Sequence, residues 1–226
     1  MRQTWHDLLF AHWPVTPDRV RTLIPAGLTL DLFDGHAWLG VVPFHMTGVT
    51  ARGVPALPWV SAFPELNVRT YVTAGGKPGV WFFSLDAARA VAVGAARALF
   101  NLPYFTASMQ VLVMTDAVGY ESRRKRAPGG RAELSAQYAA VGPAFHATPG
   151  SLEHFLTERY CLYGVTRQGR PYRLDIHHPP WELHQAEAVF RTNTMAEAAG
   201  IPLPPGAPLL HFARRQDMVA WAPQPL

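Results

Sequence analysis

The chain has 226 residues and a mass of 25.0 kDa, which is enough to bury a core in one large domain or two small ones. Hydrophobic residues make up 49% and charged residues only 16%, a balance that excludes a disordered chain. Twenty-one prolines and eighteen glycines interrupt the sequence too often for a helix bundle. The single cysteine excludes a disulfide framework and a cysteine-built zinc site.

The charge and hydropathy pattern limits the partners. There is no apolar run of about eighteen residues and no signal-peptide start, so we expect a cytoplasmic protein with no membrane partner. The net charge of +4 comes mainly from scattered arginines, with only Lys77 and Lys125 as lysines. The one dense basic run, residues 123–126, has no interleaved aromatic residues, which favours a solvated hairpin tip and predicts no nucleic-acid partner.

Turn and cap signals divide the chain into short elements. Thr16 and Pro17 are typical of a helix start, Asp34-Gly35 is a strong hairpin signal, and Asp86 and Ser151 are expected to cap two further helices. The predicted elements are, in chain order, a strand at 8–13, a helix at 17–24, strands at 28–33, 37–46, 63–72 and 80–85, a helix at 87–100, strands at 107–114, 119–123 and 132–140, a helix at 151–159, a hairpin with strands at 160–166 and 172–176, and a last hairpin at 209–221 that turns near Gln216-Asp217.

This pattern of about ten strands with three inserted helices predicts an α+β fold built on a curved, mainly antiparallel sheet. Because strands follow strands directly, a doubly wound parallel sheet is not expected. No repeat, linker-like stretch or low-complexity tract divides the sequence, so we expect one domain over residues 1–226.

Metal and nucleophile signals are weak. His177 and His178 are adjacent and would point to opposite faces of a strand, and His178 joins His184 and Glu182 only if the intervening proline corner folds back. Structural or surface histidines are the favoured interpretation. Cys161 has no activating neighbour other than an arginine and is expected to be a small core residue. No phosphate-binding, dinucleotide-binding or nucleophile-elbow motif occurs, so neither a metal nor a cofactor is predicted.

The strand at 63–72 carries the strongest functional signal. Its period of two places Glu65, Asn67, Arg69 and Tyr71 on one face and apolar residues on the other. This face is either solvent-exposed with a cross-strand ion pair, or it lines a pocket. The apolar flanks favour the pocket, in which Arg69 would bind an anion, Glu65 would handle a proton, and Arg69 would keep Glu65 ionised.

The following strand could complete this pocket in one of two registers. One register places Ser84 and Asp86 beside the polar face, and a slip of one residue replaces them with Phe83 and Leu85. The alternation of residues does not decide between the two.

Motifs spread along the chain resemble one bacterial family. They are Phe10-Ala11-His12-Trp13-Pro14-Val15, the segments 28–35, 65–72 and 79–86, Leu102-Pro103-Tyr104, Arg159-Tyr160-Cys161-Leu162-Tyr163 and His178-Pro179-Pro180-Trp181. In this order they are similar to the YqjF-like family of uncharacterised proteins, which is similar in turn to the acetoacetate decarboxylase superfamily. The resemblance implies a single domain whose strands wrap into a cone-like barrel around a small-molecule pocket.

The resemblance also implies what this pocket keeps and what it lacks. Glu65 matches the family's pocket acid, with Arg69 on the same face. Decarboxylases form a Schiff base through a lysine in a Phe-Pro-Lys-Lys segment, whereas Leu102-Pro103-Tyr104 stands at the similar position here. Neither Lys77, in a glycine-rich turn, nor Lys125, in the basic run, replaces that lysine. Schiff-base chemistry is therefore not expected.

Two functions of different class follow. The first is a protein that binds a small acidic or carbonyl metabolite, most simply an organic acid, in a pocket formed by Glu65 and the ligand-binding candidates Asn67, Arg69, Tyr71, Ser84, Asp86 and Tyr104. The second is a non-covalent lyase or isomerase on a keto or enol acid, with Glu65 as acid or base and Arg69 and Tyr104 stabilising an enolate or carboxylate. A purely structural or interaction role is the third possibility. The sequence leaves open whether a reaction is catalysed and whether the chain forms a homo-oligomer.

Overall fold

The structure is a computed structural model that describes residues 1–50, 61–89, 101–124 and 131–226. Its strands are β1 (Arg2–Val15), β2 (Thr29–Leu30), β3 (Ala37–Thr50), β4 (Phe63–Ala74), β5 (Lys77–Ala87), β6 (Tyr104–Val113), β7 (Val118–Arg124), β8 (Glu133–Phe145), β9 (Cys161–Val165), β10 (Pro171–His177), β11 (Leu183–Asn193), β12 (Leu209–Ala220) and β13 (Gln224–Pro225). The helices of the described residues are α1 (Pro17–Arg21), α3 (Leu152–Thr157) and the 3-10 helix η1 (Glu197–Ala199).

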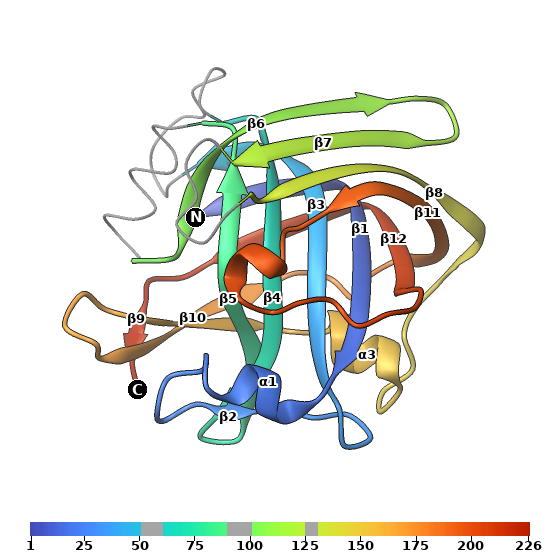
Figure 1. The fold of residues 1–226 in the computed structure, drawn as a ribbon. Coiled ribbons are helices and arrows are strands. Elements are labelled where there is room, and N and C mark those ends of the chain that lie inside the picture. The colour runs from blue at the N-terminus through green and yellow to red at the C-terminus, as the bar shows by residue number, and fades with distance from the viewer. Residues whose placement is uncertain (51–60, 90–100, 125–130) are drawn as a thin grey trace.

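These strands form one sheet in the order β13-β10-β9-β5-β6-β7-β8-β11-β12-β1-β3-β4-β2. Further pairings of β5 with β4 and of β10 with β12 curl the sheet into a barrel-like ring. Every pairing between the strands is antiparallel except those of β5 with β6 and with β9. Figure 1 shows β1, β3, β4 and β5 side by side as a wall, with the β6–β7 hairpin crossing over one end. The predicted α+β fold with a curved, mainly antiparallel sheet is confirmed.

Strand β4 separates the main core from a second interior space. Leu66, Val68 and Val72 face a core that also contains Val118 and Leu134, from β7 and β8. The alternation of β4 directs Glu65, Asn67 and Arg69 to the opposite side, where smaller apolar clusters surround a cavity.

Several elements differ from the sequence-based expectation: the strand expected at 28–33 is only the two-residue β2, β13 and η1 were not expected, and two larger differences concern β12 and β11. Residues 209–221 do not form a hairpin, because β12 continues through Gln216 and pairs with β1 along nearly its whole length. The polar Gln216 occupies a buried ladder position, where its amide donates a hydrogen bond to the carbonyl oxygen of Pro179 (2.8 Å). Strand β11 was not expected, because its alternating exposed and half-buried residues give a weak hydrophobic signal.

The helix starts agree only in part with the cap signals. Pro17 begins α1, and the Ser151 hydroxyl accepts a hydrogen bond from the His154 amide at the start of α3. Asp86 is not a cap, because β5 continues through Ala87. The rest of the helix expected at 87–100 lies largely outside the described residues. No helix among the described residues is long and apolar enough to cross a membrane.

The basic run is not simply a solvated tip. Arg123 and Arg124 belong to the end of β7, and Arg124 is buried against Asp86. Arg123 forms an ion pair with Glu133 at 3.0 Å. Residues 125–130 lie outside the described part of the chain.

Candidate functional site

The polar face of β4 lines a cavity of about 440 Å³, a volume typical of small-molecule sites. Strands from all parts of the chain contribute to its wall. The polar or charged side chains on it include Glu65, Asn67, Arg69, Tyr104, Arg159 and His178, and the apolar ones include Trp5, Leu8, Phe44, Phe63, Leu85, Trp181 and Met218. A largely apolar cavity with a few converging polar groups is the usual form of a ligand site.

Glu65 is a buried carboxyl group with one side-chain partner. The Tyr104 hydroxyl donates a hydrogen bond to Glu65 Oε2 at 3.1 Å. Burial raises the pKa of Glu65 to about 8, the Tyr104 hydrogen bond acts in the opposite direction, and the charge on Asp86 adds to the rise. The Tyr120 hydroxyl lies 2.8 Å from the backbone carbonyl oxygen of Glu65 and holds this part of β4 in place. Glu65 therefore changes protonation near neutral pH, the range useful for acid–base chemistry.

Arg69 is a half-buried cation with weak partners. Its guanidinium lies over the rings of Phe10 (5.3 Å) and Tyr71 (5.7 Å), and Nη2 is 3.5 Å from the carbonyl oxygen of Leu156. Its Nε is buried without a hydrogen-bond partner. Among the described residues, no carboxylate forms an ion pair with Arg69.

The expected pairing of Arg69 with Glu65 is wrong. The pKa of Glu65 is raised rather than lowered, and Arg69 is not among its causes. Four steps along an extended strand separate the two Cα atoms by about 13 Å, too far for a direct contact between these side chains when they lean apart. Glu65 leans toward Tyr104 on β6, whereas Arg69 leans toward Phe10 on β1.

Other polar atoms on the cavity wall lack partners. Asn67 Oδ1 and the indole Nε1 atoms of Trp5 and Trp181 are buried without a hydrogen bond. The two indole rings stack with centroids 5.9 Å apart. Buried polar groups are normally hydrogen-bonded, so this wall offers donors and an acceptor to a bound molecule or to ordered water.

Tyr71 lies behind the cavity rather than on its wall. Its hydroxyl donates to the carbonyl oxygen of Leu156 (2.7 Å) and lies 2.6 Å from His12 Nε2. Burial lowers the pKa of His12 well below its usual value, so His12 is neutral at pH 7 and donates its Nε2 proton to Tyr71. Tyr71 therefore supports the Arg69 guanidinium from the side.

Ser84 and Asp86 do not join the polar face. In the observed register Asp86 pairs with Leu66 and Ser84 with Val68, so both point toward the main core. The alternative register is the one that forms, and it places Leu85 on the cavity wall. An extra residue in β5 opposite the Val68–Arg69 step then turns Phe82, rather than Phe83, toward the cavity.

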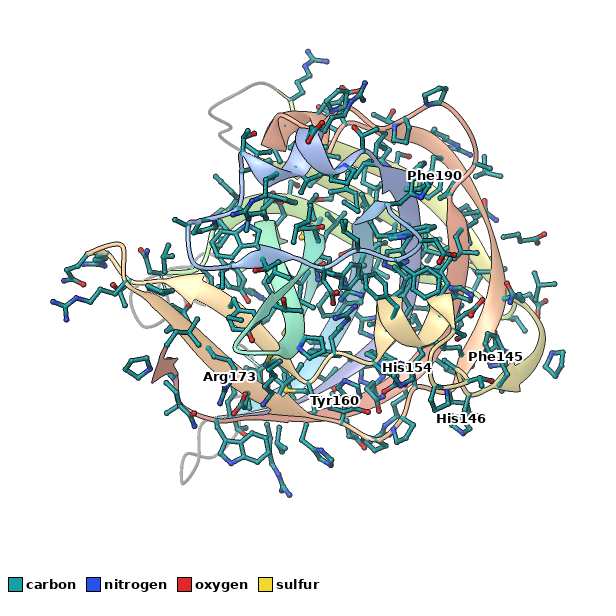
Figure 2. The ribbon with its side chains drawn as sticks, turned by 90° about the horizontal axis from the view of Figure 1, so that it is seen from below. Phe145, His146, His154, Tyr160, Arg173 and Phe190 are labelled. Atoms are coloured by element: carbon teal, nitrogen blue, oxygen red, sulfur yellow. The ribbon has the colours of Figure 1, made fainter. Side chains whose placement is uncertain are left out.

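The histidines and the cysteine have structural surroundings. The two ring nitrogens of His178 lie 2.8 Å and 3.3 Å from the carbonyl oxygens of Pro179 and Arg159, and its ring stacks on Tyr160. Figure 2 shows Tyr160 beside the β9–β10 strands. Cys161 is fully buried, and His177 is exposed. Within the described residues, no group of three or more His, Cys, Asp and Glu side chains is placed to hold a metal ion.

Sequence reasoning missed several wall residues. Trp5, Arg159 and Trp181 come from segments that show no period of polar residues, and only the motifs of the family resemblance contain two of them. Arg159 is not a free cation, because its Nη1 lies 2.6 Å from Asp31 Oδ2. Of Arg69 and Arg159, Arg69 is therefore the one that has no acidic partner among the described residues.

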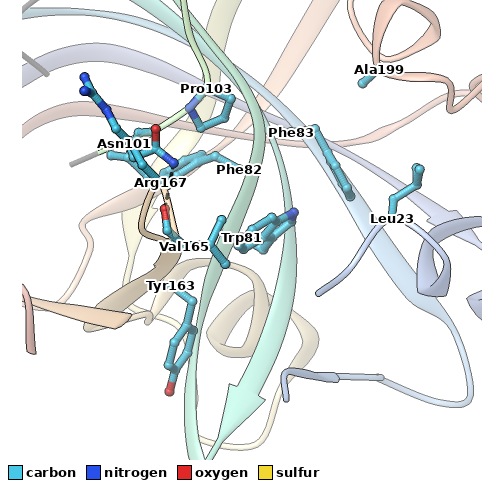
Figure 3. Close-up of a pocket in the computed structure, with 12 residues that line it drawn as sticks. Leu23, Trp81, Phe82, Phe83, Asn101, Pro103, Tyr163, Val165, Arg167 and Ala199 are labelled. Carbon is cyan, nitrogen blue, oxygen red and sulfur yellow. Dashed lines mark hydrogen bonds between the residues drawn. The ribbon is translucent and has the colours of Figure 1, made fainter. Parts of the chain in front are cut away.

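A second hollow of about 570 Å³ lies between β5, β9 and the chain leading into β6. Figure 3 shows its aromatic side chains and the hydrogen bond from Asn101 to the carbonyl oxygen of Val165 (2.9 Å). This hollow is more open than the cavity beside Glu65, and its charged lining residue Arg167 is exposed, so the cavity beside Glu65 is the stronger candidate site.

Solved structures of one fold are similar to this chain. MppR, an enduracididine biosynthesis enzyme complexed with pyruvate, has a TM-score of 0.65 and 12% identity, covering 99% of this chain and 89% of that chain. An acetoacetate decarboxylase-like enzyme from Sphingomonas wittichii RW1 has a TM-score of 0.67 and 12% identity, covering 100% of this chain and 92% of that chain. Acetoacetate decarboxylase from Legionella pneumophila has a TM-score of 0.63 and 11% identity, covering 100% and 87%. The fold is therefore acetoacetate decarboxylase-like.

The sequence of this chain is much more similar to a member of one protein family than to these solved structures. The chain is 49% identical over 221 residues to the uncharacterized protein YqjF of Bacillus subtilis (strain 168), which covers 98% of this chain and 90% of YqjF. The model of DUF2071, a family described as an uncharacterized conserved protein, matches residues 2–217. The resemblance inferred from the motifs is thus confirmed, and the protein belongs to the YqjF-like family DUF2071.

Proposed function

We propose that the protein binds a small organic acid in the cavity beside β4. The observation that carries this proposal is Arg69, a half-buried cation that faces a largely apolar space and has no acidic partner among the described residues. A charge removed from water is costly unless an opposite charge and hydrogen bonds compensate it. A ligand carboxylate would supply both, and the structurally similar MppR is complexed with pyruvate.

Binding of simple carboxylates tests this proposal. Calorimetric titration with hexanoate is compared with hexanamide, which has the same length but no charge. We expect the acid to bind more tightly, and Arg69→Met to weaken it by roughly 10- to 100-fold, or about 1–3 kcal/mol. Arg191→Met, at an exposed position of β11, is the control and should change nothing. Equal binding of acid and amide, or an unaffected Arg69→Met variant, would exclude the proposal.

A second candidate function is proton transfer on a bound keto or enol acid, without a covalent intermediate. It is favoured by Glu65, whose pKa of about 8 and hydrogen bond to Tyr104 suit a general acid or base. We propose that this chemistry proceeds without a Schiff base, because the described residues of the cavity wall include no lysine. The test is the exchange for deuterium of the hydrogens next to the ketone of 5-oxohexanoate, in deuterated water and followed by NMR. Glu65→Gln should abolish exchange while the acid still binds.

A further inference from the structure

We propose that the cavity selects its ligand by length, binding an extended monocarboxylate that places its carboxylate at Arg69 and a carbonyl oxygen at Glu65. This inference rests on the proposed function and narrows it to acids oxygenated at a distance from the carboxylate. Short 2-oxo and 3-oxo acids reach only one of the two positions.

The first step is the separation of the two polar ends. Glu65 and Arg69 lie four residues apart on β4, and the extra residue of the local bulge belongs to β5, so β4 itself stays regular. Their Cα atoms are therefore about 13 Å apart. The side chains also diverge, since Tyr104 holds the Glu65 carboxyl toward β6 and the Arg69 guanidinium lies over Phe10 of β1.

Gly40 fixes the direction of Arg69. Gly40 lies on β3, where it is the cross-strand partner of Arg69 on β4 and of His12 on β1. A Cβ atom at Gly40 would lie only 3.2 Å from Arg69 Cγ and 3.0 Å from His12 Nε2. The glycine thus lets the arginine stem cross over β3 toward β1, away from Glu65.

The second step converts this separation into a ligand length. Because the two side chains diverge, their hydrogen-bonding atoms are at least as far apart as the Cα atoms. A hydrogen bond of about 3 Å at each end then leaves at least roughly 7 Å between the ligand's carboxylate oxygen and its carbonyl oxygen. An extended chain covers about 1.2 Å per bond, so at least about six bonds separate the two oxygen atoms. Six bonds correspond to a 5-oxo acid, which is therefore the shortest acid expected to reach both positions, and a 6-oxo acid is the next in length.

The wall between the two ends is consistent with an aliphatic chain. It includes Leu8, Val42 and Phe44, which are apolar and buried. Below pH 8 the Glu65 carboxyl is mainly protonated and can donate a hydrogen bond to a carbonyl oxygen. Asn67, midway between the two ends, offers a further polar contact that a second oxygen on the chain would use.

A matched series of acids tests this inference. Dissociation constants are measured at pH 6.5 for pyruvate, 4-oxopentanoate, 5-oxohexanoate and 6-oxoheptanoate, and for pentanoate, hexanoate and heptanoate without the oxo group. We expect the oxo group to improve affinity most at position 5 or 6, by about tenfold, and pyruvate to bind weakly. In Glu65→Met this gain should disappear while hexanoate still binds, and Arg69→Met should weaken every acid.

The outcomes separate the two proposals. If acids bind through Arg69 but the oxo group gives no gain at any position, the length selection is wrong and the organic-acid site stands. If pyruvate binds as tightly as 5-oxohexanoate, the length selection is also wrong. If no acid binds, both proposals fail. If Glu65→Met does not fold, Tyr104→Phe repeats the test, because it keeps the Glu65 side chain. This variant should reduce the affinity gained from the oxo group, and hexanoate should still bind.

Discussion

Folding makes the Glu65 carboxyl harder to ionise, and this has a consequence for stability. The side chain is 4% exposed, and its pKa of about 8 in the folded protein lies above the ordinary value of 4.5. Between these two values the folded chain holds a proton that the unfolded chain releases. The free energy of unfolding therefore falls as the pH rises through this window.

Glu65→Gln should remove this pH dependence. Glutamine is neutral throughout, so relative to the variant the wild-type protein should lose about 1.4 kcal/mol of stability for each pH unit between about 5 and 8. Urea unfolding of both proteins at pH 5.5 and pH 8 measures the difference. Glu187→Gln, at an exposed position of β11, is the control. Parallel stability curves for wild type and Glu65→Gln would show that Glu65 is ionised in the folded protein.

The lysines give a second prediction for single residues. Lys77 Nζ lies 2.8 Å from Asp175 Oδ1, partly exposed and away from the cavity wall. Because Lys77 is held in this ion pair outside the cavity wall, its amine does not reach a keto acid bound beside Glu65. We expect no covalent adduct after incubation with acetoacetate and reduction with borohydride, as measured by intact mass. An added mass that maps to Lys77 or Lys125 would restore the Schiff-base mechanism.

At the scale of elements, the alternation of polar and apolar residues predicts which side chains share a face of a strand, but not the register in which that strand pairs with its neighbour. The period of two in β4 predicts a polar face of Glu65, Asn67, Arg69 and Tyr71. The first three line the cavity, whereas Tyr71 lies behind it. The placement of Ser84 and Asp86 could not be predicted, because a shift of one residue exchanges the two faces of β5 and depends on the turn and the bulge.

Strand β5 also depends on a glycine whose role the sequence did not reveal. A Cβ atom at Gly79 would lie 2.6 Å from Cys161 Sγ and 2.9 Å from the Cys161 carbonyl oxygen, where β5 pairs with β9. Gly79→Ala should therefore force the two strands apart and cost about 1–3 kcal/mol. In β7, Gly119 has its nearest atoms at 3.8 Å, so Gly119→Ala should be neutral or slightly stabilising. Urea unfolding compares the two variants, and equal stabilities would contradict this account.

At the scale of the whole molecule, the cavity could not be assembled from sequence alone. Trp5 and Trp181 stack on one wall, although they lie far apart in the sequence and neither belongs to a predicted polar pattern. Their contact depends on the pairing of β1 with β12 and the path of the chain after β10. Local periodicity identifies which residues face inward but not which strands become neighbours.

Among the described residues, a buried ion pair joins β5 to β7, the two strands that flank β6 in the sheet. Arg124 Nε and Nη2 of β7 each lie 2.7 Å from a carboxylate oxygen of Asp86 on β5, and both side chains are almost completely buried. Burial raises the pKa of Asp86, and Arg124 acts in the opposite direction. The two hydrogen bonds thus compensate the burial of both charges, and removing either side chain would leave the other charge buried without its partner.

Breaking this pair should destabilise the fold far more than replacing it. Arg124→Met leaves a buried carboxylate without its partner and should cost about 3–5 kcal/mol, whereas Asp86→Leu combined with Arg124→Met should be nearly neutral, because the double variant leaves no unpaired charge in the core. Arg215→Met, in the exposed pair with Asp217, should change stability by less than about 0.5 kcal/mol. Urea unfolding of the four proteins of the Asp86–Arg124 cycle gives the coupling free energy. Additive effects of the two substitutions would mean that the core tolerates either charge alone and that other contacts hold β5 and β7 in place.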